Sequence, residues 1–322
     1  GSSMTTARID EAAETLVIAG AGQRPTTAEL IGPRARVDAR VTGGGKTWKA
    51  TFPLRASRWG GPELPLPTGD YELRIAGAEF GDLLIAPEVL AGVRIAVDGA
   101  TVRIAAPIDP AYETSEGQAT LEGRYVAHPG ATENAVFFES FYGRTVGCNP
   151  QAIDRALFAQ APDVVRYWSV VDLSVAVPDG AIAVVEGSPE WWRARAASRL
   201  LVVNDWLRRR FVRKPGQKVL QTWHGTPLKR LALHRPGFDP RRMAAVVKES
   251  RRWDVLLAQN TYSERILRKA YAFFGRPIWV EGYPRNDALV TGDAAGIRGD
   301  LGIADGERVL LYAPTWRDDL TE

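Results

Sequence analysis

The sequence predicts a two-domain protein in which an all-β sandwich precedes an α/β domain built on a parallel sheet. Three observations lead to this fold class. The chain has 322 residues, which is more than one hydrophobic core usually organises. Up to about residue 125 it consists of short runs of alternating apolar and polar residues, the period of half-buried strands. Beyond residue 130, strand-like runs alternate with helical stretches, which is typical of parallel strands joined by helical crossovers.

Turn residues separate the strand-like runs of the first half. These runs cover residues 36–41, 47–52, 71–75, 93–97 and 101–104. Asp98-Gly99 joins the last two, and Asp-Gly between alternating runs is a strong β-hairpin signal. We expect about seven strands in an immunoglobulin-like sandwich over residues 8–128. This segment lacks a cluster of side chains suited to catalysis, so we expect a spacer or docking module. Residues 1–4 resemble a tag remnant followed by a start methionine.

The second half, residues 132–293, is expected to form one α/β domain. Its predicted strands cover residues 135–138, 164–171, 181–185, 200–203, 218–223, 253–258 and 278–281. Asn149-Pro150 and Ser188-Pro189 each provide an N-cap and a first helical residue, and residues 261–264 have the pattern of a capping box. Ligands of parallel sheets bind at the carboxyl ends of the strands. Residues 294–322 are expected to hold a linker, up to residue 305, and then a strand at 309–312.

The most informative stretch is residues 221–231, with the sequence QTWHGTPLKRL. It follows a predicted strand and places His224 and Gly225 at a turn. Thr226 suits the N-cap of a helix and the proline after it suits the first helical position, with two cations one turn further on. Free amides and the positive end of a helix dipole favour a phosphate, and the imidazole is a titratable base. The alternative is a purely structural turn.

These eleven residues resemble the QTWHGTPLKRL signature of the CDP-glycerol glycerophosphotransferases, the family of teichoic-acid primases and polymerases. Three further stretches match this family in the same order, at residues 138–143, 281–287 and 311–319. The resemblance runs from about residue 134 to the last residue. It implies a glycosyltransferase-B-like architecture of two Rossmann-like domains, of which the second holds most of the nucleotide donor. We therefore expect the acceptor-side domain and only the start of the donor-side domain, as a truncated form of a longer protein.

The implied reaction moves glycerol phosphate from CDP-glycerol, or a related CDP-polyol, to the hydroxyl end of a teichoic-acid or capsule-like acceptor, and releases CMP. The acceptor would be lipid-linked or a glycan polyol phosphate, and no cofactor or metal is implied. His224 is the expected general base, because a base near neutrality assists attack by a hydroxyl. Glu139 either orients His224 or makes a structural hydrogen bond. The expected substrate-binding residues are Gly225, Thr226, Lys229, Arg230, Arg285, Asn286, Asp287, Arg317 and Asp318.

Two of these residues, Arg285 and Arg317, can bind a phosphate bidentately, which lysine cannot do. Their alternative is a salt bridge that anchors a loop, with Asp287 or Asp318 as the partner. The alternative for the cations that follow His224 is a solvated helix face.

Basic residues gather in the second half of the chain. Residues 205–252 hold 14 Lys and Arg against three Asp and Glu. The densest part, residues 206–214, is expected to contact an anionic membrane surface or the acceptor, with a solvated face as the alternative. Its predicted contacts are Trp206, Arg208, Arg209, Arg210, Arg213 and Lys214.

The sequence also limits the class of protein. Its apolar runs are too short for a transmembrane helix and no signal peptide is recognised, so we expect a cytoplasmic protein, peripheral at the inner face of the membrane. A single cysteine, Cys148, excludes an internal disulfide and a cysteine-based zinc site. No nucleic-acid partner is expected, because the basic residues lack the interleaved aromatic residues of a stacking platform. The alternative function is a non-catalytic module that binds anionic polymer or membrane.

Overall fold

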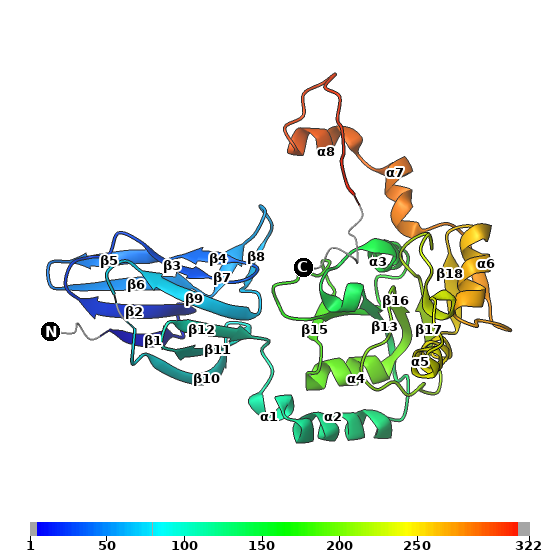
Figure 1. Ribbon diagram of the computed structural model, residues 1–322, viewed down its shortest axis with the longest axis horizontal. Coiled ribbons are helices and arrows are strands. Elements are labelled where there is room, and N and C mark those ends of the chain that lie inside the picture. Colours follow the sequence, from blue (N-terminus) through cyan, green and yellow to red (C-terminus); the bar gives the residue numbers. More distant parts are fainter. Residues whose placement is uncertain (1–4, 79, 315–322) are drawn as a thin grey trace. The chain divides into compact units, whose positions relative to one another are not determined.

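The computed structural model of the chain describes residues 5–78 and 80–314 (Figure 1). These residues belong to two compact units, and the boundary between the units falls between Arg285 and Asn286. The first unit contains an antiparallel β-sandwich and a parallel α/β domain. No helix in the described part of the chain is long and apolar enough to span a membrane.

Twelve strands build the first part of the described chain. They are β1 (Thr6–Asp10), β2 (Thr15–Ala21), β3 (Ala28–Ile31), β4 (Arg36–Asp38), β5 (Arg40–Gly44), β6 (Thr47–Pro53), β7 (Arg55–Ser57), β8 (Glu63–Pro65), β9 (Gly69–Ile75), β10 (Leu84–Leu90), β11 (Val93–Asp98) and β12 (Thr101–Ala105). One sheet has the order β1-β2-β6-β5, a second has the order β10-β11-β12-β9-β3-β4, and β7 pairs with β8.

The alternating sequence pattern creates the core between the two large sheets. In β6, Trp48, Ala50 and Phe52 are buried, and the residues between them are less buried. They belong to the same hydrophobic cluster as Val102 and Ile104 of β12, which lies in the other sheet. Full burial of a Val, Ile or Phe side chain contributes about 1.5–3 kcal/mol. The two sheets therefore form a sandwich around one core, and its immunoglobulin-like topology stays a prediction.

The number of strands exceeds the expected seven, because one predicted run is divided and several short strands lie outside the predicted runs. The run 36–41 forms two strands, and the chain changes sheet at Ala39: β4 pairs with β3, whereas β5 pairs with β6. The hairpin predicted from Asp98-Gly99 is confirmed, since β11 and β12 pair antiparallel with Asp98 opposite Thr101.

Two helices, α1 (Pro110–Glu113) and α2 (Ser115–Ala127), follow the last sandwich strand. The expectation of strands up to the end of the predicted sandwich is therefore wrong. The Thr114 hydroxyl caps α2 by accepting a hydrogen bond from an amide of its first turn. Leu121 and Tyr125 of α2 are buried in the core of the α/β domain. They stand four residues apart and so share one helix face, but few other apolar residues mark that face in the sequence.

Seven parallel strands form the sheet of the described α/β domain. They are β13 (Glu133–Glu139), β14 (Val165–Val170), β15 (Ile182–Val185), β16 (Ser198–Val203), β17 (Lys218–Gln221), β18 (Val255–Ala258) and β19 (Ile278–Val280). The helical elements are η1 (Phe141–Gly143), α3 (Cys148–Gln160), α4 (Pro189–Ala197), η2 (Ala232–His234), α5 (Pro240–Ser250) and α6 (Thr261–Ala270). The sheet order is β15-β14-β13-β16-β17-β18-β19. The direction of strand addition reverses between β13 and β16, the place where ligands of such sheets usually bind.

Helices cover both faces of this sheet (Figure 1). The contacts of two consecutive residues of β13 illustrate the two layers. Phe137 packs edge-on against Trp191 of α4, with ring centroids 5.9 Å apart. Phe138 stacks on Trp168 at 5.2 Å and belongs to a cluster that includes Ile153 of α3. Because successive side chains of a strand point to opposite faces, this pair directs one helix layer to each side. The predicted parallel sheet with helices on both faces is confirmed.

The predicted helix starts are right at one position and displaced at two others. Ser188 accepts a hydrogen bond from the Trp191 amide at 3.2 Å and begins α4, as predicted. The capping residue of α6 is Asn260 rather than Thr261. Asn149, predicted as an N-cap, lies inside α3, and its side chain bonds to a different loop.

The second unit contains α7 (Ala288–Thr291) and α8 (Ala294–Asp300), after the turn η3 (Pro284–Asp287). The expected linker over residues 294–305 is therefore helical in its first part, because Asp293 accepts a hydrogen bond from an amide of α8 at 2.9 Å. The strand expected at 309–312 is wrong, since these residues have no regular structure. A strand needs a neighbour for its backbone hydrogen bonds, and the described residues of this unit form none.

One buried cation ties α2 to the α/β domain. The Nζ atom of Lys214 lies 2.6 Å from the Tyr125 carbonyl oxygen, 3.0 Å from that of Val126 and 3.2 Å from that of His128. These carbonyls lie at the end of α2, where no further helix N–H groups are present to bond them and where the helix dipole favours a positive charge. Lys214 is 4% exposed, and burial lowers the pKa of its ammonium group.

We expect Lys214→Met to lower the free energy of unfolding by about 1–3 kcal/mol, because three carbonyl groups lose their shared donor. Urea unfolding followed by circular dichroism measures this change. Lys218→Met is the matched control, because the Lys218 side chain is 72% exposed and its replacement should change stability by less than about 0.5 kcal/mol. Equal effects of the two substitutions would contradict the anchoring role of Lys214.

Candidate active site

Three loops come together at the carboxyl ends of β13, β16 and β17. They are residues 140–147, 204–205 and 222–231. The first two strands flank the point where the sheet order reverses. The third loop carries His224, which the sequence singled out as the general base. The loops therefore occupy the usual ligand position of a doubly wound sheet.

The orientation of His224 is fixed by a backbone contact. Its Nδ1 atom lies 2.6 Å from the carbonyl oxygen of Asn204. A carbonyl oxygen only accepts hydrogen bonds, so Nδ1 carries the proton and Nε2 presents its lone pair. The imidazole stacks on Trp223 at 4.7 Å and contacts Phe141 at 5.5 Å between ring centroids. Within the described residues no hydrogen bond involves Nε2, so this nitrogen can accept a proton from a bound group.

Asn204 connects the loop that carries His224 to the loop after β13. Its backbone carbonyl binds the imidazole, and its side-chain oxygen accepts a hydrogen bond from the Phe141 amide at 2.8 Å. Its side-chain nitrogen donates to the Ser140 hydroxyl at 3.2 Å. Asn204 is fully buried. The sequence interpretation missed this residue, although a polar pair, Asn204-Asp205, directly after a buried strand was a usable signal.

Three consecutive carbonyl groups around His224 are each held by a different side chain. Asn149 of α3 donates to the Trp223 oxygen at 3.2 Å, and the Arg285 guanidinium donates to the His224 oxygen at 2.7 Å. The Tyr283 hydroxyl donates to the Gly225 oxygen at 3.1 Å, and burial raises the pKa of that hydroxyl to about 12. We call these three contacts the carbonyl clamp. It confirms that Arg285 lies beside His224, whereas its phosphate-binding role stays a prediction.

The clamp is also connected internally. The backbone amide of Arg285 donates to the Asn149 side-chain oxygen at 3.3 Å, and the guanidinium reaches Cys148 Sγ at 3.2 Å. Asn149 thus links α3 to both the His224 loop and the segment after β19. The Asn149 side chain is used for these tertiary contacts. For this reason Asn149 does not cap α3 as predicted, and its place in the site was not recognised from the sequence.

Backbone strain gathers in the same loops. Phe141, Tyr142, Cys148 and Trp223 all have positive φ, between 46° and 58°. Each non-glycine residue in this left-handed region costs about 1–3 kcal/mol, and such residues cluster at functional sites. Gly143 follows with φ +76°, and a Cβ atom there would lie 3.0 Å from the Ser169 oxygen of β14. The loop after β13 is therefore pressed tightly against the neighbouring strand.

No helix begins directly after His224, which contradicts the prediction. Residues 222–231 are irregular, and the next α-helix is α5. Thr226 is not an N-cap, because its hydroxyl donates to a glutamine side chain of the β18–α6 loop at 2.9 Å. Lys229 and Arg230 are exposed on the irregular segment. The helix-dipole argument for a phosphate site therefore fails, and the substrate contacts expected of this segment stay predictions.

Glu139 does not contact the imidazole. Its carboxylate accepts a hydrogen bond from the Ser169 hydroxyl at 2.7 Å, and the same hydroxyl accepts one from the indole of Trp191 at 2.8 Å. Burial raises the pKa of the Glu139 carboxyl group. Of the two roles considered for Glu139, the structural hydrogen bond is the one observed, because the Asn204 carbonyl already orients His224.

The basic segment 206–214 mainly stabilises the α/β domain. Arg208 and Arg209 both pair with Glu186, and Lys214 lies buried against the end of α2. Arg210 is exposed. Because most of these cations are engaged within the domain, the segment is not a free basic face. The predicted membrane contact is wrong for Lys214 and has no structural support for its neighbours.

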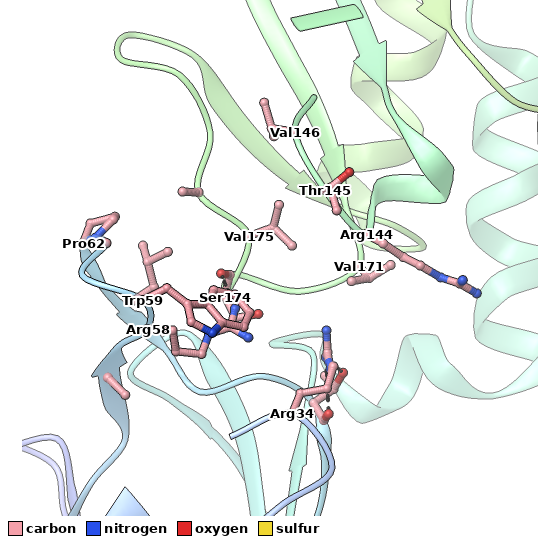
Figure 2. Close-up of a pocket in the computed structure, with 15 residues that line it drawn as sticks. Arg34, Arg58, Trp59, Pro62, Arg144, Thr145, Val146, Val171, Ser174 and Val175 are labelled. Atoms are coloured by element: carbon pink, nitrogen blue, oxygen red, sulfur yellow. Dashed lines mark hydrogen bonds between the residues drawn. The ribbon is translucent and has the colours of Figure 1, made fainter. Parts of the chain in front are cut away.

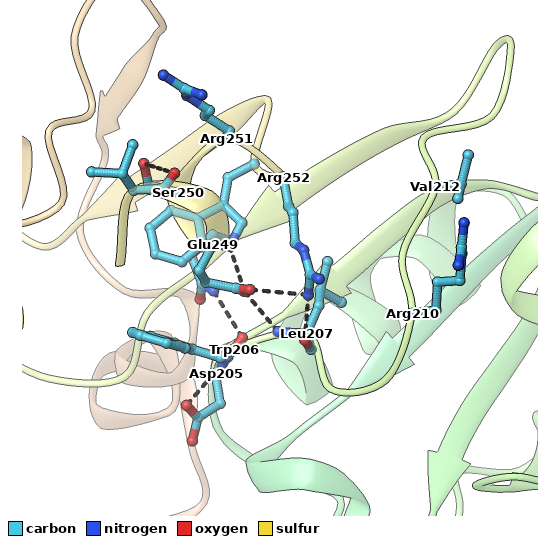
Figure 3. Close-up of polar contacts among 12 residues, drawn as sticks. Asp205, Trp206, Leu207, Arg210, Val212, Glu249, Ser250, Arg251 and Arg252 are labelled. Atoms are coloured by element: carbon cyan, nitrogen blue, oxygen red, sulfur yellow. Dashed lines mark hydrogen bonds and ion pairs between the residues drawn. The ribbon is translucent and has the colours of Figure 1, made fainter. Parts of the chain in front are cut away.

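Figure 3 shows how this segment is fixed to the end of α5. The Glu249 carboxylate accepts hydrogen bonds from the Leu207 amide at 2.7 Å and from the Trp253 indole at 3.2 Å. Arg252 donates to the Leu207 oxygen at 2.6 Å and pairs with Glu249 at 3.1 Å. Trp206 is half-buried and packs on an aromatic ring of the segment after α6. Arg213 donates to the Arg252 oxygen at 2.8 Å.

Four predicted substrate-binding residues lie outside the first unit. Asn286 and Asp287 belong to the second unit. Arg317 and Asp318 lie beyond the described residues. Their roles stay predictions.

Comparison with known proteins identifies the family. The model of the CDP-Glycerol:Poly(glycerophosphate) glycerophosphotransferases matches residues 123–322. A teichoic acid poly(glycerol phosphate) polymerase of Bacillus subtilis (strain 168) is 38% identical over 197 residues, which cover 57% of this chain and 26% of that protein. A teichoic acid glycerol-phosphate transferase of Staphylococcus aureus (strain NCTC 8325 / PS 47) is 32% identical over 212 residues, covering 58% of this chain and 51% of that protein. The chain thus spans about a quarter to a half of the length of these relatives.

Solved structures of the wall teichoic acid polymerase TagF have a similar fold. One, of a variant, matches with a TM-score of 0.58 and 31% identity, covering 63% of this chain and 54% of that chain. Another, of a variant soaked with CDPG, has a TM-score of 0.56 and 30% identity, covering 64% and 58%. The family match includes the loops that hold His224, Asn204 and the carbonyl clamp. The chain therefore belongs to the CDP-glycerol:poly(glycerophosphate) glycerophosphotransferase family.

Proposed function

We propose that this chain carries the acceptor-activating part of a polyol-phosphate transferase. The transferred group is glycerol phosphate, the donor is CDP-glycerol or a related CDP-polyol, and the acceptor is the hydroxyl end of a polyol-phosphate chain. The observation that carries the proposal is the 2.6 Å hydrogen bond from His224 Nδ1 to the Asn204 oxygen, because it keeps Nε2 available as a base. Membership of the family supports the donor class.

In the proposed reaction, the acceptor oxygen attacks the β-phosphorus of the donor while its proton moves to His224 Nε2. A new oxygen–phosphorus bond forms, the bond from that phosphorus to the CMP oxygen breaks, and CMP leaves. Phosphoryl transfer depends mostly on positioning and on neutralising charge. Arg285 uses one nitrogen to hold the His224 carbonyl. A guanidinium has five N–H donors, so others can bind a phosphate oxygen.

The carbonyl clamp supports this chemistry by limiting motion of the base. A general base is effective only within hydrogen-bond reach of the proton that it removes. Trp223, His224 and Gly225 are each held through their carbonyl oxygens, and the imidazole is held through Nδ1. The loop therefore presents Nε2 in one orientation, with little entropy left to lose when the acceptor binds.

The acceptor in this proposal is lipid-linked or a glycan polyol phosphate, of the teichoic-acid or capsule type. Two relatives carry teichoic acid in their names, and a TagF variant was soaked with CDPG. Donor contacts from a second Rossmann-like domain form part of the proposal, because the relatives are longer than this chain. Location at the inner face of the membrane stays a prediction, and residues 206–214 no longer serve as its proposed contact.

We expect His224→Ala to lower the rate of glycerol phosphate transfer from labelled CDP-glycerol by about 10²–10⁴-fold, because the acceptor hydroxyl loses its base. The rate is measured in the longest natural form of the protein that contains this chain. Added imidazole should restore part of the lost rate, since a small base can enter the vacated space. His234→Ala is the control, because His234 is exposed and its loss should change the rate by less than about threefold. A His224→Ala rate that matches this control would reject the assignment.

Glu139 gives a second test, which separates a structural carboxylate from a catalytic one. Its pKa is raised by burial above the ordinary value of 4.5. In the pH range between the two values the folded protein binds more protons than the unfolded chain, so this group lowers stability as pH rises through that range. Glu139→Gln keeps an acceptor for the Ser169 hydroxyl and removes the titration of the carboxyl group.

We expect the free energy of unfolding of Glu139→Gln, relative to that of the unchanged protein, to increase from about pH 4.5 upward. The transfer rate should change by less than about tenfold. Urea unfolding at several pH values and the transfer assay check both parts; an unaltered pH profile, or loss of transfer like that of His224→Ala, would contradict the structural role.

A further inference from the structure

A pocket lies in the first unit, and its lining includes no residue of the carbonyl clamp (Figure 2). Its volume is about 900 Å³, within the range of small-molecule sites. One wall is formed by sandwich residues around β7 and β8, and the other by residues 144–146 and by Val171 with residues 174–176. The latter two segments follow β13 and β14. The pocket thus adjoins the same carboxyl edge of the sheet as His224, on the side of β14.

The lining of this pocket is cationic. Arg34, Arg58 and Arg144 line it, and its described lining contains no Asp or Glu. Arg58 of the sandwich wall donates a hydrogen bond to the Ser174 oxygen of the opposite wall at 3.1 Å. Arg144 is exposed at the rim, and Figure 2 shows its guanidinium directed away from the pocket. Arg34 and Arg58 are therefore the cations of the inner lining, and Arg34 is paired with Asp172 through one of its nitrogens.

A buried carboxylate behind the lining holds Arg34 in place. Asp172 accepts hydrogen bonds from Arg34 at 2.8 Å and from the Thr68 amide at 3.0 Å with one oxygen, and from the Ser174 amide at 3.0 Å with the other. Burial raises its pKa, but the hydrogen bonds from Ser174, Thr68 and Arg34 outweigh that effect and hold the pKa below its usual value. Asp172 therefore stays ionised and joins the two walls, which orders the pocket before any ligand binds.

An aromatic side chain completes the pocket. Trp59 is 92% exposed, has a left-handed backbone with φ 51°, and its ring lies 5.1 Å from the Arg58 guanidinium carbon. The indole and the Arg58 guanidinium thus lie next to each other in the lining of the pocket. A flat apolar ring can cover the C–H groups of a polyol, while neighbouring guanidinium groups bind phosphate oxygens.

We propose that this pocket is a second subsite, which binds phosphate-linked repeats of an anionic polyol-phosphate chain. The inference rests on the function proposed above and extends it to the β-sandwich, which lies outside the family match. A free phosphate would use the arginines but not the indole, and a neutral glycan would use the indole but not the arginines. A polyol-phosphate chain matches both. With its hydroxyl end at His224, such a chain has earlier repeats available for a neighbouring subsite on the same sheet edge.

The test measures binding of a synthetic glycerol phosphate hexamer to the chain by calorimetry, with inorganic phosphate and free glycerol as the other probes. We expect the hexamer to bind more tightly than either small probe. The double substitution Arg58→Ser with Trp59→Ala should weaken hexamer binding by about tenfold or more, because it removes one cation and the aromatic surface. Raising the salt concentration should also weaken binding, since the contacts are ionic.

The matched control is Arg103→Ser with Leu84→Ala, which removes one cation and one exposed apolar side chain from the sandwich outside the pocket. It should bind the hexamer like the unchanged chain. If the pocket variant binds like this control, or if inorganic phosphate binds as tightly as the hexamer, the subsite is rejected. His224→Ala separates the two proposals, because it should lower the transfer rate by about 10²–10⁴-fold while leaving most hexamer binding intact. A His224→Ala transfer rate like that of the His234→Ala control would reject the proposed function, whereas the binding data alone decide the subsite.

Discussion

The arrangement of the site depends on the carbonyl clamp. Three consecutive carbonyl oxygens, those of Trp223, His224 and Gly225, are fixed from α3 and from the segment after β19. Each such hydrogen bond contributes about 0.5–1.5 kcal/mol, and those to charged groups contribute more. Together they offset the strain of the left-handed Trp223, which costs about 1–3 kcal/mol. A loop without regular secondary structure is thereby held by contacts with two distant segments.

Burial and hydrogen bonding also decide what the charged residues do. The basic composition of residues 205–252 suggested a surface for anions. In the structure, Lys214 closes the end of α2, and Arg208 pairs with Glu186. Arg34 and Arg58 of the sandwich and Arg285 of the clamp are the cations used in the two proposals, and none of them belongs to this stretch. Local charge density in a sequence therefore does not tell which cations are used in contacts within the protein.

The elements that the sequence predicted well are those with a strong local signal. The strand pattern of the parallel sheet, the Asp98-Gly99 hairpin and the Ser188 cap each depend on residues close together in the chain. The histidine itself was recognised from its motif. The helix expected after His224 failed because Thr226 and the residues around it are used in contacts with distant loops. Asn149 and Asn204 were missed for the same reason, since an asparagine that bridges two loops looks in sequence like any capping or turn residue.

The position of α2 has a consequence for dividing this protein into fragments. The helix falls within the segment that the sequence assigns to the sandwich, yet Leu121 and Tyr125 lie in the core of the α/β domain and Lys214 binds its last turn. The family match begins at residue 123, inside this helix. A fragment that starts there would lose the first part of α2, including Leu121 of the core and Gln118, whose side-chain oxygen accepts a hydrogen bond from the Trp192 indole at 3.2 Å. The autonomous α/β fragment has to begin between Ala105 and Asp109, upstream of both helices, if its core is to remain closed.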